Sequence, residues 1–120
     1  MFSLCSEHRF LLYSAPTDMR KSFDGLSGVI QNQLLSDPRS GDVFIFINKS
    51  RDKIKLLYWE GSGYTLYYKR LEKGRFELPR YNSKAGSIRL SYSQMVMIID
   101  GLSIKNISKR KRYLSPKVRG

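Results

Sequence analysis

The first third of the chain has apolar residues at helical spacing. Five of them recur every three or four positions: Met19, Phe23, Leu26, Ile30 and Leu34. This spacing is typical of one face of an amphipathic helix, so we predict a long helix over 17–36. Thr17 or Asp18 is the expected N-cap, and 37–38, an Asp-Pro pair, ends the helix. A short strand over 8–14 precedes it.

The middle of the chain has the pattern of strands instead. Residues 43–47 are an unbroken apolar run of strand-forming types, typical of a strand that is buried on both faces. Two further strands, at 53–59 and 64–70, are separated by the glycine-rich turn 60–63. We therefore predict an α+β fold: a mainly antiparallel sheet meander, with one long helix packed on it and a short C-terminal helix.

The second half of the chain is more polar. Residues 79–87 form a predicted loop, a short strand follows around 87–90, and a helix over 92–100 begins after Ser91 or Ser93. The stretch from 104 to 120 has seven basic residues and no acidic one. We expect a single α+β domain over 1–103 and a basic C-terminal tail over 104–120.

The pairing of strands 53–59 and 64–70 decides which side chains share a face. If Trp59 pairs with Tyr64, one face holds Lys53, Lys55, Trp59, Tyr64, Tyr68 and Arg70. If the register slips by one residue, Tyr67 and Lys69 join Lys53, Lys55 and Trp59 instead. The sequence leaves both registers open, and each of them mixes cations with aromatic side chains.

Charge adds a functional hypothesis. The 120 residues carry a formal net charge of +12, which favours association with a polyanion such as nucleic acid. The single cysteine, Cys5, excludes an intrachain disulfide, and one Cys with one His cannot form a Cys/His zinc cluster. With no apolar run of about 18 residues and no secretory signal, we expect a cytoplasmic protein without membrane contact or cofactor.

The segment from 49 to 76 is the predicted nucleic-acid interface. It holds eight of the 22 basic residues together with the only tryptophan. Cations suit phosphates, and an aromatic ring can stack on an exposed base. The candidate nucleic-acid-binding residues are Lys49, Arg51, Lys53, Lys55, Trp59, Lys69, Arg70, Lys73 and Arg75.

The carboxylates give little support for catalysis. A two-metal nuclease needs acidic side chains that converge on ions about 4 Å apart. Asp52, Glu60 and Glu72 lie at turns or strand ends, but Asp52 and Glu60 flank the same predicted strand, roughly 25 Å apart. We therefore expect no catalytic residues and no metal site, and retain a small metal-dependent nuclease only as the weakest hypothesis.

Three segments together resemble a known family. They are Thr17 to Leu26 (TDMRKSFDGL), Ile54 to Gly63 (IKLLYWEGSG) and Tyr68 to Phe76 (YKRLEKGRF). In this order and at these separations, they are similar to the TnpB-type accessory protein of bacterial insertion sequences of family sixty-six, the product of the second open reading frame. The likeness covers 9–78 closely and 88–102 loosely. Ser22 and Glu60 depart from the usual glycine and aspartate.

The resemblance implies a role in transposition beside a separate transposase that carries the catalytic triad. It implies no active site in this chain. The leading hypothesis is a non-enzymatic accessory factor whose partners are DNA, at the transposon ends, and the transposase of the same element. The alternative is a protein–protein adaptor that docks on the transposase without touching DNA, with Phe23, Gly25 or Gly28 at the contact.

Overall fold

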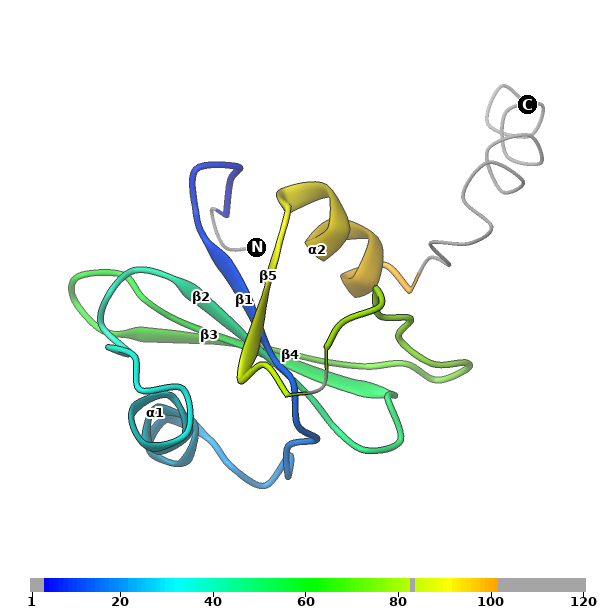
Figure 1. The fold of residues 1–120 in the computed structure, drawn as a ribbon, viewed down its shortest axis with the longest axis horizontal. Helices are drawn as coiled ribbons and strands as arrows, with labels where there is room; N and C mark the ends of the chain where they lie inside the picture. Colours follow the sequence, from blue (N-terminus) through cyan, green and yellow to red (C-terminus); the bar gives the residue numbers. More distant parts are fainter. Residues whose placement is uncertain (1–3, 83, 102–120) are drawn as a thin grey trace.

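A five-stranded sheet forms the centre of the molecule, as the computed structural model of residues 4–82 and 84–101 shows (Figure 1). The spatial order of the strands is β4-β3-β2-β1-β5. The strands are β1 (Phe10–Tyr13), β2 (Val43–Ile47), β3 (Lys53–Trp59), β4 (Tyr64–Arg70) and β5 (Ser87–Leu90). Two helices, α1 (Phe23–Asn32) and α2 (Tyr92–Ile99), lie on opposite sides of the sheet (Figure 1). The predicted α+β class is confirmed, whereas the expected tail at 104–120 lies outside the described residues.

The sheet is mixed, so the prediction of a simple antiparallel meander is wrong for the sheet as a whole. β1 and β2 are parallel neighbours, with Phe10 opposite Val43. Parallel neighbours need a crossover connection, and here α1 lies in the crossover between the two strands. β5 then adds to the free edge of β1 in antiparallel orientation.

The other pairings are antiparallel and local. β2 pairs with β3, and β3 pairs with β4 across the 60–63 turn. Trp59 lies opposite Tyr64 and Lys53 opposite Arg70, which selects the first of the two registers left open by the sequence. Lys69 therefore points to the face opposite to that of Lys55.

Helix α1 is much shorter than predicted. It covers ten residues from Phe23 to Asn32 rather than 17–36, and its N-cap residue Ser22 makes no side-chain capping bond. Asp18 is not a cap: its carboxylate accepts hydrogen bonds from the backbone and guanidinium of Arg20. At the other end, Leu35 takes the left-handed conformation (φ 51°), which stops the helix.

Two apolar layers cover the two faces of the sheet. On one face, Leu26 and Ile30 of α1 are fully buried against Phe44 and Phe46. Phe23, which was expected in this layer, is 43% exposed.

On the other face, α2 and the 71–78 segment cover the sheet, and their buried members include Met95, Ile98 and Phe76. Neither face of the central strands is open to solvent.

The two glycines of α1 differ in their surroundings. A side chain at Gly25 would approach Cβ of Lys21 to 3.0 Å, so the Lys21 side chain would have to shift to make room for it. A side chain at Gly28 would meet nothing within 4 Å. Close approach within the chain therefore explains Gly25, whereas Gly28 faces open space.

Helix α2 begins with a reciprocal capping box. The Ser91 hydroxyl accepts a hydrogen bond from the Gln94 backbone N–H (3.1 Å), and the Gln94 side chain accepts one from the Ser91 backbone N–H (2.9 Å). Of the two serines that the sequence offered, the cap is thus Ser91.

Replacing Ser91 with alanine is expected to lower the free energy of unfolding by about 1 kcal/mol, because the Gln94 backbone N–H loses its acceptor. Thermal or urea unfolding measures the loss. Ser93→Ala, in the first turn but outside the box, is the matched control and should change stability by less than about 0.5 kcal/mol. Equal losses in the two variants would contradict the role of Ser91.

Candidate nucleic-acid interface

Six of the nine predicted binding residues meet at one end of the sheet. The β2–β3 turn carries Lys49 and Arg51, and the 71–76 loop carries Lys73 and Arg75. These loops are held together by backbone hydrogen bonds from Leu71 N–H to Asp52 O (2.7 Å) and from Phe76 N–H to Arg51 O (2.6 Å). Register places the remaining pair, Lys53 and Arg70, directly opposite each other. We call this cluster the basic end: Lys49, Arg51, Lys53, Arg70, Lys73 and Arg75.

The basic end is strongly positive even after its ion pairs are counted. Within residues 48–53 and 70–76 there are two acidic side chains beside the six cations. Asp52 lies 3.5 Å from Lys53, and Glu72 lies 2.8 Å from Arg70 and raises the pKa of that guanidinium. The other four cations are exposed and belong to none of the ion pairs found among the described residues.

The β2–β3 turn is braced by one amide side chain. Oδ1 of Asn48 accepts hydrogen bonds from the backbone N–H groups of Asp52 (3.1 Å) and Lys53 (3.0 Å). Its Nδ2 donates to the Asp52 carboxylate at 2.7 Å, and this bond lowers the pKa of Asp52 below the ordinary value of 3.8. Arg51 is left-handed (φ 58°), a conformation that costs a non-glycine residue about 1 kcal/mol. The turn is therefore fixed in shape although its outer residues are exposed.

Asn48→Ala is expected to lower the free energy of unfolding at neutral pH by about 1 to 3 kcal/mol, since two turn N–H groups lose their acceptor. The pKa of Asp52 should rise toward 3.8. A carboxyl group with a lowered folded-state pKa stabilises the fold above about pH 4 and loses that effect as pH falls through the folded value. The variant should therefore lose less stability than the wild type on acidification.

Urea unfolding at several pH values, with carboxyl titration by NMR, measures both effects. Asn32→Ala, at an exposed position ending α1, is the control. An unchanged Asp52 titration in Asn48→Ala would show that Asn48 does not set this pKa.

Lys55, another predicted interface residue, lies inside the fold and apart from the basic end. It is only 5% exposed, and its ammonium donates to the backbone carbonyls of Met19 (2.8 Å) and Lys21 (2.7 Å). The Tyr68 ring lies 4.5 Å from the same nitrogen. Burial lowers the pKa of Lys55, and the charge of Asp18 opposes that change. Lys55 thus contacts the segment before α1 and, as a buried residue, does not belong to the exposed cations of the basic end.

Lys69 and Trp59 also lie away from the basic end. The Lys69 ammonium donates to the Ile99 carbonyl at 2.7 Å, where it stabilises the C-terminus of α2.

Trp59 ends β3, about 20 Å along the strand from Lys53. Its ring packs edge-on against Tyr64 (5.0 Å), and the Arg39 guanidinium lies 4.6 Å from the ring centre. Neither residue joins the six cations in space.

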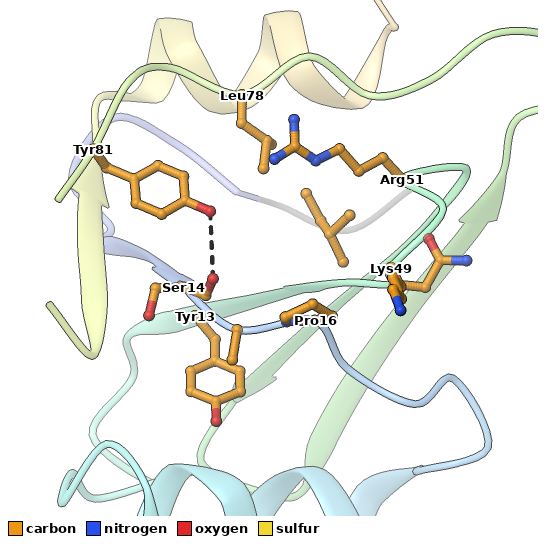
Figure 2. Close-up of a pocket in the computed structure, with 10 residues that line it drawn as sticks. Tyr13, Ser14, Pro16, Lys49, Arg51, Leu78 and Tyr81 are labelled. Carbon is orange, nitrogen blue, oxygen red and sulfur yellow. Dashed lines mark hydrogen bonds between the residues drawn. The ribbon is translucent and has the colours of Figure 1, made fainter. Parts of the chain in front are cut away.

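The structure adds a hollow that the sequence analysis missed. Its volume is about 130 Å³, and it lies between the end of β1, the β2–β3 turn and the chain around Leu78 and Tyr81 (Figure 2). The Tyr81 hydroxyl donates to the Ser14 carbonyl at 3.3 Å. The neighbouring Arg80 and Tyr81 were a cation–aromatic pair visible in the sequence, but the surrounding polar residues indicated only a loop.

The acidic side chains stay apart or pair with other groups. Glu60 accepts a hydrogen bond from the Thr65 hydroxyl at the far end of β3, whereas Asp52 and Glu72 belong to the basic end. Among residues 4–82 and 84–101, no three His, Cys, Asp or Glu side chains are grouped so that they could hold a metal ion. Within the same residues, no helix has both the length and the apolar character needed to cross a membrane.

Comparison with known proteins identifies the family. The model of a family described as IS66 Orf2 like protein matches residues 8–109. The chain belongs to this family. The match confirms the resemblance seen in the three sequence segments and extends past residue 104, into the stretch assigned above to a basic tail.

Relatives of the IS66 Orf2-like chain include two proteins of Sinorhizobium fredii (strain NBRC 101917 / NGR234). Uncharacterized protein y4jC is 34% identical over 108 residues, which cover 90% of each chain. Uncharacterized protein y4hO is 32% identical over 94 residues, covering 78% of this chain and 80% of its own. No solved structure matches. Family membership makes this a transposition-associated accessory protein of an insertion sequence.

Proposed function

We propose that this protein is a non-enzymatic accessory factor that binds DNA at the transposon ends through its basic end. The observation that carries the proposal is the joining of two separate loops into one cluster of six cations. Family membership supplies the transposition context. The proposed partners are the DNA of the element and its transposase, in the cytoplasm of a bacterium.

The arrangement suits phosphate contacts rather than the reading of base edges. Four cations stand on loops outside any described ion pair, and the braced β2–β3 turn fixes the backbone beneath two of them. Such contacts release counterions from DNA, so their number sets the dependence of affinity on salt. They position a protein on DNA and carry little sequence information.

A fluorescence anisotropy titration with duplex DNA, single-stranded DNA and RNA at several salt concentrations tests the proposal. Four to six contacts should give a slope of log K against log salt of about −4 to −5 for duplex DNA. A flat slope, or no binding, would contradict DNA binding. Magnesium-dependent cleavage that is lost on replacing Asp52 or Glu72 would contradict the non-enzymatic part of the proposal.

The adaptor function is a second proposal, favoured by the apolar residues that α1 leaves uncovered. Phe23, the first residue of α1, is 43% exposed, and Leu35, just beyond the helix, is 84% exposed. Docking of the transposase on this side predicts co-purification that survives nuclease treatment and high salt. Phe23→Ser and Leu35→Ser should abolish that co-purification; retention in both variants would reject this surface.

A further inference from the structure

Two hollows adjoin beside the basic end, and they share Arg51, Leu78 and Tyr81 in their walls. The deeper one is the 130 Å³ hollow of Figure 2. The other, about 410 Å³, lies along the chain that includes Arg80. Building on the proposed DNA binding, we infer that the deeper hollow takes the base of one unpaired nucleotide, while the flanking phosphates lie on the surrounding cations.

The walls of the deeper hollow suit a flat ring. Leu78, Pro16 and Ile47 provide apolar surface, and the Tyr81 ring adds an aromatic one. Figure 2 shows the Tyr81 hydroxyl directed at Ser14, whose carbonyl it meets at 3.3 Å, so the ring is held at one edge of the hollow. Aromatic and apolar walls accept any base, because every base has a π-face.

The charge around both hollows suits a nucleic acid backbone. The residues that line them include three cations, Lys49, Arg51 and Arg80, and no carboxylate. Arg51 lies in the wall of both hollows, and in Figure 2 its side chain extends from the β2–β3 turn toward Leu78. A strand whose base enters the deeper hollow would thus pass its phosphates from Lys49 past Arg51 to Arg80.

Only an unpaired nucleotide fits this arrangement. In a duplex the bases are stacked inside the helix and their faces are covered, so a base can enter a hollow only from a single strand or after extrusion. The exposed cations of the basic end, by contrast, can contact the phosphates of a duplex from outside. The structure therefore separates two modes of contact: duplex phosphates at the basic end, and one unpaired base in the hollow.

The test compares Tyr81→Ala and Tyr81→Phe in the full chain, by anisotropy with a single strand of about 12 nucleotides, the corresponding duplex and an RNA of the same sequence. Tyr81→Ala should lose roughly tenfold in affinity for single-stranded DNA and less than about twofold for duplex. Tyr81→Phe, which keeps the ring, should stay close to wild type. Arg51→Asn removes the shared cation but keeps a residue that tolerates the left-handed backbone, and should weaken both DNA forms.

The outcomes separate the inference from the proposed function. No binding to any nucleic acid would reject both. Duplex binding with salt dependence, combined with single-strand binding that Tyr81→Ala leaves unchanged, would reject the hollow alone. RNA bound more tightly than DNA with the same dependence on Tyr81 would support the base site in the hollow and contradict DNA as its ligand. Arg89→Gln, an exposed cation of β5 that lines neither hollow, is the charge control and should have little effect.

A second measurement uses the unaltered protein, so that misfolding of a variant cannot mimic the result. A single strand carrying a photoreactive halogenated uracil is crosslinked to the protein, and the attached residue is located by mass spectrometry. Attachment at Tyr81 or Leu78 supports the inference. Attachment confined to Trp59, at the other end of β3, would overturn it.

Discussion

Replacing Lys49, Lys73 and Arg75 together with glutamine is expected to lower the affinity for duplex DNA by about 500-fold at 0.1 M salt. Each phosphate contact contributes nearly tenfold at this salt concentration through counterion release. The three side chains are exposed, lie on the two loops of the basic end and belong to none of the described ion pairs. The slope of log K against log salt should become shallower by about 2.7.

The matched control removes the same amount of charge elsewhere. Arg9, Lys84 and Arg89 are exposed and outside the basic end, and their replacement by glutamine leaves the same net charge as the first triple variant. Anisotropy across salt concentrations measures both variants. If the two lose affinity equally, net charge alone governs binding and the basic end has no special role. If the first variant keeps the wild-type slope, the proposed contacts are wrong.

The parts of the fold that follow from local signals were predictable. Strands 53–59 and 64–70 occur where the sequence placed them, because a short glycine-rich turn joins two strand-like runs. The partner of β1 was not predictable in this way, since Phe10 and Val43 pair across a crossover. The order strand–helix–strand was a hint of parallel pairing, but the three consecutive strands that follow suggested a meander.

The start of α1 shows a tertiary contact that overrides a periodic pattern. The apolar spacing extended the helix back to 17, and Met19 does pack on the same layer as Leu26. The backbone there is nevertheless not helical. The carbonyls of Met19 and Lys21 instead accept hydrogen bonds from the Lys55 ammonium. The donor to the Lys21 carbonyl lies 34 residues further along the chain, so this contact cannot be inferred from a local pattern.

The candidate interface was predictable as charge but not as surface. Cations clustered in the sequence between 49 and 76, and six of them do meet in space. Lys55 and Lys69 belong to the same cluster in sequence, yet each is bound to a backbone carbonyl of the segment that covers its face. The hollow beside Tyr81 brings together three stretches far apart in the chain, and only the fold shows it.

Lys55 also explains how the three segments that carry the family resemblance meet. The side chain belongs to the segment from 54 to 63, binds the carbonyls of the segment from 17 to 26, and lies against Tyr68 of the third. Lys55 as a residue is 5% exposed, so its ammonium has lost part of its hydration and these contacts replace it. Carbonyl oxygens and an aromatic face are suitable replacements.

Lys55→Met is expected to lower the free energy of unfolding by about 2 to 4 kcal/mol, because the carbonyls of Met19 and Lys21 lose a charged donor while the apolar stem is kept. The Thr17 N–H, which donates to the Ile47 carbonyl at 2.9 Å, should exchange with solvent faster as the segment before α1 loosens. Urea unfolding and amide hydrogen exchange measure the two effects. Lys84→Met, at an exposed lysine, should change stability by less than about 0.5 kcal/mol.

The opposite result has a clear physical meaning. Replacing a buried charge by a well-packed apolar side chain is in some proteins neutral or stabilising, since the cost of desolvating the ion disappears. If Lys55→Met were as stable as the wild type and Thr17 exchanged at the same rate, the segment before α1 would be held by packing of Met19 and not by the ammonium. A loss of stability with faster exchange at Thr17 identifies Lys55 as the residue that joins the chain before α1 to the sheet.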